Sequence, residues 1–170
     1  ARLRTKDKWI HCDTPEPLAD LARLSEEFCA EKASSHDPAQ ARPLQLIGRR
    51  HVRSNNSWMH NYHRLVKGPN RCTLLMHPQD IQQRNILEGS EVEVRSRVGA
   101  LQVVVEASAE IMPGVVSLPH GFGHHREGIR MDIAQRHAGV SCNDITDEYA
   151  LDELSGNAAV NGISVEVVPA

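Results

Sequence analysis

The sequence has few aromatic residues and no closely spaced pair of cysteines. Phe, Trp and Tyr make up 4% of its 170 residues, so an apolar core must be built mainly from Val, Leu, Ile and Ala. No C-x-x-C pair occurs, which excludes a locally encoded zinc ribbon or iron–sulfur cluster. The four scattered cysteines are expected to be reduced, which favours a cytoplasmic location.

Long apolar runs and a strong excess of one charge are also absent. No run is long enough to cross a bilayer and no signal peptide is visible, so no membrane partner is expected. The net charge of -3 argues against a nucleic-acid partner bound through a large basic face. The apolar fraction of 40% is ordinary for a globular domain with a buried core. The chain begins with Ala1 rather than Met, as expected of a piece excised from a longer protein.

The first 43 residues differ in pattern from the rest. Leu18, Leu21, Leu24 and Phe28 recur at helical spacing among charged residues, which predicts an amphipathic helix over roughly residues 15–32. A polar stretch that ends at Pro43 then predicts a linker.

From Leu44 onward the pattern is typical of short strands joined by turns. Polar and apolar residues alternate over 91–97, which is the clearest strand signal. Met112-Pro113-Gly114 predicts a type II turn, and Asn161-Gly162 predicts a hairpin. Many short strands and few helices predict a small β-barrel. The expected strands are 44–48, 72–76, 91–97, 101–105, 115–118 and 163–168, with a short helix from Pro78 to about Asn85.

The segment 48–61 is the first that could carry chemistry. It follows a strand directly and offers three arginines with several Ser and Asn side chains. Arginine forks suit phosphates, and Ser or Asn suits phosphate or base edges. A solvated loop with residues that cap a short helix explains the same composition equally well.

Two further polar segments are less specific. Residues 119–126 contain two glycines that would let the backbone approach a ligand closely, but alone they are typical of a glycine-rich turn. Their histidines lack the Cys or carboxylate partners of a recognisable metal site. In 142–147, Asn and Asp could read a purine edge, but the preferred interpretation is a cap for a helix over 148–151.

No combination of nucleophile, base and acid is apparent, so we expect neither a catalytic nor a metal site in this chain. The pair Gly89-Ser90 has the residue types that some small barrels cleave to form a pyruvoyl group, but here it lies in an ordinary turn before a strand. Residue chemistry alone indicates a module that binds an anionic ligand.

Several runs of residues stand in a specific order along the barrel region. The runs are L-I-G-R-R-H-V-R-S-N-N-S-W-M-H-N (46–61), G-P-N-R-C-T-L-L-M-H-P-Q-D (68–80), E-G-S-E-V-E-V-R-S-R-V-G (88–99), M-P-G-V-V-S-L-P-H-G-F-G-H (112–124), N-D-I-T-D (143–147) and L-S-G-N-A-A-V-N-G-I (154–163).

In this order the runs resemble the C-terminal dinucleotide-binding domain of formate-dehydrogenase-like molybdopterin oxidoreductases, within the dimethyl sulfoxide reductase superfamily. The resemblance implies a double-psi β-barrel of the aspartate-decarboxylase-like type over residues 44–170. It implies that residues 1–43 are a helix and linker from the preceding region of a parent enzyme. The partners would be the remaining domains of that enzyme, including its iron–sulfur and metal-site domains.

The resemblance also implies a ligand, molybdopterin guanine dinucleotide, with Mo or W in the parent enzyme and no cofactor in the isolated fragment. The 49–61 loop would meet pyrophosphate, ribose or pterin, and the 120–124 loop would line the same cleft. The implied cofactor-binding residues are Arg49, Arg50, His51, Arg53, Ser54, Asn55, Ser57, His120, Gly121, Gly123, His124, Asn143 and Asp144.

Phe122 stands where members of the family often carry Trp, a mild departure. The iron–sulfur cysteines and the metal-ligating residue of the family precede this region, so the chain alone is expected to have no redox activity. Two alternatives remain: a stand-alone barrel enzyme such as a pyruvoyl decarboxylase that uses Ser90, and a protein-interaction barrel. A chain split between Gly89 and Ser90 would support the first, and indifference to Arg49, Arg50 or Asn143 substitution would support the second.

Overall fold

The computed structural model describes residues 3–12, 14–33 and 43–170. Its contacts divide the chain into two units. One unit contains α1 (Pro15–Ala33) together with residues 152–157, and the other contains the strands and the remaining helices. Within the described residues, no helix is long and apolar enough to cross a membrane. The predicted linker falls outside the described residues except for Pro43.

Helix α1 confirms the helix predicted from the apolar spacing. Pro15 occupies its first turn, where a missing N–H costs no hydrogen bond, and Glu16 places a negative charge near the positive end of the helix dipole. Leu18, Leu21 and Leu24 are each about half exposed.

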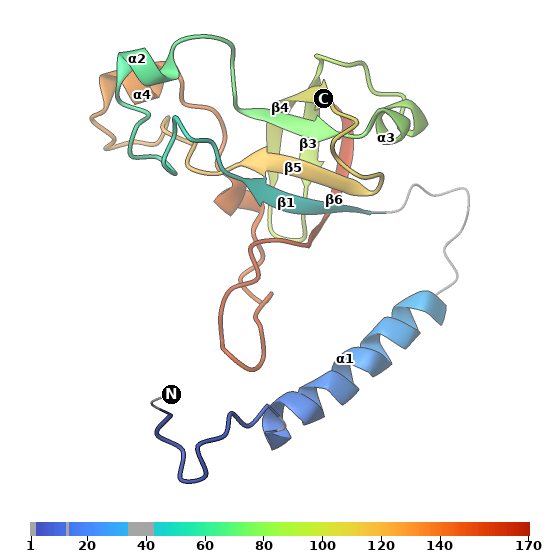
Figure 1. Ribbon diagram of the computed structural model, residues 1–170. Coiled ribbons are helices and arrows are strands. Elements are labelled where there is room, and N and C mark those ends of the chain that lie inside the picture. Colours follow the sequence, from blue (N-terminus) through green and yellow to red (C-terminus); the bar gives the residue numbers. More distant parts are fainter. Residues whose placement is uncertain (1–2, 13, 34–42) are drawn as a thin grey trace. The chain divides into compact units, whose positions relative to one another are not determined.

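The second unit is a closed six-stranded barrel, which confirms the predicted mainly-β barrel with short helices (Figure 1). The order around the barrel is β1-β5-β2-β4-β3-β6, and β6 closes on β1. The β1/β5 and β2/β4 pairs are parallel and the other four pairs are antiparallel. The strands are β1 (Leu44–Arg49), β2 (Thr73–Met76), β3 (Glu91–Arg95), β4 (Ala100–Ala107), β5 (Val115–Pro119) and β6 (Ile163–Pro169).

The alternation read from the sequence places the core inside the barrel. In β3, Val92 and Val94 are fully buried while Glu91 and Arg95 are exposed. Strands β4 and β6 bury every second residue in the same way. Because successive side chains point to opposite faces of a strand, this pattern fills the interior with Val, Leu and Ile.

The turn before β5 confirms the prediction made from Pro113 and Gly114. Gly114 has a φ of 85°, and the N–H of Val115 donates to the carbonyl of Met112 at 3.2 Å, as a type II turn requires. The N–H of Gly114 donates to buried Asp80 of α3 (Pro78–Gln83) at 2.8 Å. Helix α3 confirms the helix expected at Pro78. Its Asp80 side chain holds the turn before β5 through this hydrogen bond.

Two local predictions were wrong. Asn161-Gly162 does not make a hairpin, because the strand after it pairs with β1 and β3 rather than with the segment before it. Instead the Asn161 side chain accepts the N–H of Gly48 at 2.7 Å. No helix forms over 148–151, and residues 142–145 form a short 3-10 helix, η1 (Cys142–Ile145), instead. The short helix α2 (His63–Val66) follows the first polar segment, for which a loop before a short helix was one of the two interpretations, and the short helix α4 (Asp132–Arg136) was not predicted.

Candidate functional site

The loops after β1 and β5 begin at the same end of the barrel. These strands are parallel, and Arg49 at the end of β1 is in register with Pro119 at the end of β5. The N–H of His120 donates to the carbonyl of Arg49 at 3.1 Å, so the two loops start as neighbours. The predicted segments 48–61 and 119–126 are therefore brought together by the topology (Figure 1).

The backbone of Gly121 packs directly against the first loop. A Cβ on Gly121 would lie 2.8 Å from the backbone nitrogen of Ser57 and closer still to the carbonyl of Asn56. Gly121 also has a φ of 89°, a conformation that side chains disfavour. On the other side of this contact, Asn55 and Asn56 have positive φ values of 42° and 58°. The contact therefore depends on glycine in one loop and on asparagine-tolerated turns in the other.

A buried pair of histidines joins the same two loops. Nδ1 of His60 lies 2.8 Å from Nε2 of His124, and the two residues are 3% and 6% exposed. The His60 ring also packs on Phe122, with ring centroids 4.3 Å apart. His60 was not among the predicted site residues, although it lies inside the run that carried the prediction.

The third predicted segment, around η1, joins this end of the barrel through the second loop. The N–H groups of Gly123 and His124 both donate to the carbonyl of Ala138, at 2.7 and 3.2 Å. Sγ of Cys142 lies 3.3 Å from Nδ1 of His120. Asn143 follows Cys142 and is exposed.

Arg49 is not free to meet a phosphate with its whole guanidinium. Its Nη2 donates to the carbonyl of Thr73 at 2.7 Å and to that of Arg71 at 3.3 Å, and its Nη1 donates to the carbonyl of Ser117. Burial lowers the pKa of Arg49, opposed by the charge of Glu106. Its side chain thus ties β1 to β2 and β5.

Arg50 and Arg53 are two exposed cations at this end of the barrel. Both are exposed, and neither side chain makes a hydrogen bond or ion pair with any residue in the described part of the chain. Burial lowers the pKa of His120 and raises the pKa of the Cys142 thiol. The positive charge of nearby Arg50 acts to lower both pKa values. Asp144, by contrast, pairs with Arg126 at the surface.

Two more of the predicted residues, His51 and Ser54, make hydrogen bonds within the first loop. His51 accepts the N–H of Arg53 at 3.1 Å through Nδ1, and buried Ser54 anchors the turns of the first loop by accepting the N–H of Met59. Sequence reasoning missed Phe122, Cys142 and Gly139 as framework. Gly139 has a φ of 58°, and a Cβ there would lie 2.7 Å from Phe122 and from Cys72.

The buried imidazoles predict a pH-dependent stability. Burial is the main cause that lowers the pKa of His60, His120 and His124. The unfolded chain, with imidazoles near their usual pKa of about 6.5, then binds protons at a higher pH than the folded chain. Stability is therefore highest above about pH 6.5 and falls as the pH drops toward the folded pKa values.

We expect the urea midpoint of the chain to be lower at pH 5.5 than at pH 7.5, and His60→Gln to reduce this difference. His63→Gln, which removes an exposed imidazole of α2, is the matched control and should leave the difference unchanged. A midpoint that does not move between these pH values would contradict the prediction.

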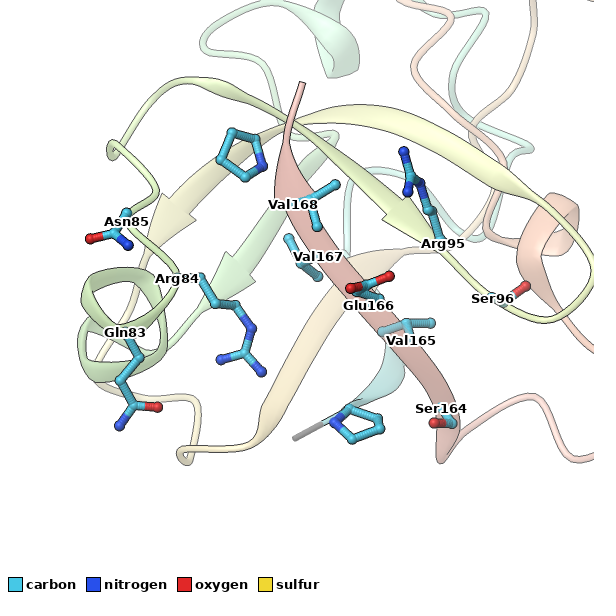
Figure 2. A pocket seen from close by; sticks show the side chains of 12 residues that line it. Gln83, Arg84, Asn85, Arg95, Ser96, Ser164, Val165, Glu166, Val167 and Val168 are labelled. Atoms are coloured by element: carbon cyan, nitrogen blue, oxygen red, sulfur yellow. The ribbon is translucent and has the colours of Figure 1, made fainter. Parts of the chain in front are cut away.

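A hollow of about 640 Å³ lies on the barrel, away from the predicted site residues (Figure 2). Gln83, Arg84 and Asn85 line one side of it and residues 164–169 of β6 the other. Its cations have carboxylate partners: Arg84 lies 3.7 Å from Asp80, and Arg95 pairs with Glu93. The hollow therefore has no excess of positive charge for an anion, and no predicted site residue lines it. Among the described residues, no three His, Cys, Asp or Glu side chains gather in a group that could hold a metal ion.

Known proteins resemble this chain over the barrel and beyond it. The family model described as "Molydopterin dinucleotide binding domain" matches residues 44–164. A tetrathionate reductase chain from Salmonella typhimurium is 25% identical over 173 residues, which cover 90% of this chain. Dimethyl sulfoxide reductase from Escherichia coli is 28% identical over 137 residues, which cover 79% of it.

A solved structure shares the fold. Acetylene hydratase from Pelobacter acetylenicus superposes with a TM-score of 0.63 over 80% of this chain at 20% identity. The chain spans 16% of the length of each of the two reductases and 21% of the hydratase chain.

Proposed function

This chain belongs to the molybdopterin dinucleotide binding domain family, and from that premise we propose that its ligand is the guanine form of the cofactor, held where the three loops meet. The observation that carries the proposal is the presence of two arginines, Arg50 and Arg53, without a partner in the described part of the chain. They stand at the end of the barrel where the loops after β1 and β5 converge.

The groups at this end fit a dinucleotide. A pyrophosphate is an anion that guanidinium groups bind through charge-assisted hydrogen bonds. Gly121 and Gly123 have positive φ values and let the second loop lie directly against the first loop and against Ser141, which brings the three segments together. Asn143 and Asp144 are exposed and carry oxygens that can accept hydrogen bonds from the N–H groups of guanine.

Each of these groups has a proposed role. Arg50 and Arg53 bind the pyrophosphate, while Asn143 and Asp144 accept from the guanine edge. Arg126 shields Asp144 in a surface ion pair, and such pairs are weak enough for a ligand to displace. Arg49 acts as a positioning residue because it fixes the point from which both loops leave the barrel.

We further propose that this domain is part of a larger, formate-dehydrogenase-like oxidoreductase. The small share of each relative that it spans supports this proposal. The bound cofactor supplies redox chemistry through its Mo or W, and other domains of the enzyme supply the metal ligand and the iron–sulfur cluster. The exposed leucines of α1 are suited to pack on such a domain.

The cofactor assignment is tested by Arg50→Ala and Asn143→Ala in the cofactor-loaded enzyme. Each removes one exposed contact among several, so we expect a two- to tenfold loss of bound cofactor, which corresponds to about one ordinary hydrogen bond of roughly 0.5–1.5 kcal/mol. The measurements are metal per chain and guanine nucleotide released by acid hydrolysis per chain.

Arg95→Ala is the control because it removes the same charge from the hollow of Figure 2. Full loading of both site variants, or a released nucleotide other than a guanine nucleotide, would remove the respective part of the proposal.

A further inference from the structure

A small pocket opens beside the histidine pair, at the end of the barrel that carries the loops. His60 and Phe122 line it, together with Arg53 and Ser54 of the first loop. Asn70, Arg71 and His137 line it from neighbouring segments. The pocket is therefore bounded by several stretches of chain that are distant in sequence.

His60 has one ring nitrogen that nothing in the described structure satisfies. Its Nδ1 is paired with Nε2 of His124 at 2.8 Å. Its Nε2 is buried and has no hydrogen-bond partner among the described residues. A buried polar atom without a partner costs about 1–3 kcal/mol, and such atoms in folded proteins commonly mark a water or a ligand that completes the site.

The charge of the pocket distinguishes between these two occupants. Its lining includes two arginines, Arg53 and Arg71, and no Asp or Glu. Arg53 has no side-chain partner in the described part of the chain. Arg71 is held by the carbonyls of Leu65 and Lys67, at 2.8 and 3.2 Å, which fix its position and do not neutralise its charge. A water molecule could satisfy His60 but would supply no negative charge to the two arginines.

An anion would satisfy all of these groups at once. Charged and titratable groups around His60 come from each neighbouring segment: His124, Arg71, Arg53 and His137. Burial, followed by the charge of His124, lowers the pKa of His60, which favours the neutral ring when no anion is bound. An anion near Nε2 has the opposite effect, because it favours the protonated ring.

We propose that this pocket is an oxyanion subsite in which His60 takes up one proton from solvent as the anion enters. The protonated ring donates from Nδ1 to His124 and from Nε2 to the anion, so both nitrogens become satisfied. Arg53 and Arg71 supply the remaining donors. The anion thereby stabilises the hydrogen bond that joins the two loops.

The source of the oxyanion is either a phosphate of the dinucleotide or a free anion. Its assignment to the dinucleotide rests on the proposed function, whereas the existence of the subsite does not. The two ideas fail separately: Arg50→Ala and Asn143→Ala test cofactor loading, and anion binding by the 170-residue chain tests the subsite.

The experiment measures sulfate binding by calorimetry at constant ionic strength, in two buffers of different ionisation enthalpy. Sulfate is the probe because it does not titrate between pH 6 and pH 8. We expect close to one proton taken up per sulfate at pH 7.5 and an affinity that falls by up to about tenfold per pH unit as the pH rises. Histidine NMR signals of the wild-type chain provide a second measurement, in which the pKa of His60 should rise when sulfate is added.

The variants are His60→Gln and Arg53→Gln, with His63→Gln and Arg95→Gln as matched controls. His60→Gln should abolish proton uptake, and Arg53→Gln should weaken sulfate binding about tenfold, because each removes a charge-assisted hydrogen bond. The controls should bind like the wild type. Sulfate binding without proton uptake, equal binding by all variants, no binding, or an unchanged His60 pKa would each overturn the proposal.

The cofactor-loaded enzyme separates the two sources. If the dinucleotide phosphate occupies the pocket, the loaded enzyme does not bind sulfate at this site, and its His60 already shows the raised pKa. If a free anion is the occupant, the loaded enzyme binds sulfate as the isolated chain does. Both results support the subsite, and they assign it to different ligands.

Discussion

Replacing Gly121 by alanine is expected to cost the protein its cofactor while the barrel stays folded. The new Cβ would lie 2.8 Å from the nitrogen of Ser57 and nearer to the Asn56 carbonyl, with backbone rather than flexible side-chain atoms in the way. The residue would also have to keep a φ of 89°, which costs a side chain roughly 1–2 kcal/mol. Because the two loops cannot both keep their positions, the site opens.

Gly128→Ala is a close control for this prediction. Gly128 has a φ of 85°, and a Cβ there would have nothing within 4 Å, so its replacement carries the conformational cost without the clash. We expect Gly121→Ala to lower cofactor content more than tenfold and Gly128→Ala to change it less than twofold. Bound metal per chain measures the loss, and amide exchange in β2 and β4 reports whether the barrel persists. Equal effects of the two substitutions would show that the loop contact is unimportant.

Replacing Arg49 by methionine is expected to destabilise the barrel itself. The guanidinium donates to the carbonyls of Ser117, Arg71 and Thr73, and methionine keeps much of the side-chain length while it removes every donor. Hydrogen bonds to a charged group contribute about 1.5–3 kcal/mol, and unpaired carbonyls add a cost of their own. We expect the free energy of unfolding to fall by about 3 kcal/mol, measured by urea denaturation of the chain.

Arg50→Met provides the comparison for Arg49. Arg50 is adjacent in sequence, exposed, and without a side-chain partner in the described part of the chain, so its loss should change the free energy of unfolding by less than about 0.5 kcal/mol. When both variants are kept folded at low temperature, Arg50→Met should lose more cofactor than Arg49→Met. A stable Arg49→Met chain would show that its hydrogen bonds are replaced by water.

The sequence predicted those features of the fold that depend on neighbouring residues. The alternation over 91–97 identified β3, and Pro113-Gly114 identified a turn whose glycine has the φ that the turn type requires. The hairpin at Asn161-Gly162 failed because a turn signal does not specify which strand pairs with the next one. That choice is made by β1, at the opposite end of the barrel sequence.

The candidate site was predictable as a set of segments and not as a set of contacts. The ordered motifs identified the loops, but nothing local shows that Arg49 turns toward Thr73 and Ser117 while Arg50 is exposed to solvent. His60 was overlooked for the same reason, since its significance comes from His124 and from a nitrogen without a partner among the described residues. Both facts depend on the parallel register of β1 and β5, which is a property of the closed barrel.

The order of strands around the barrel has a consequence for biosynthesis. The two neighbours of β1 are β5 and β6, and Leu46 pairs with Ile163, so the first strand of the barrel must wait for the last to leave the ribosome. Contacts between such distant residues form slowly because a long loop must close first. The β1/β5 pair from which the two loops leave is part of a closed barrel only at that point. A cofactor site that depends on the closed barrel is therefore complete only after the final strand of the barrel has been translated.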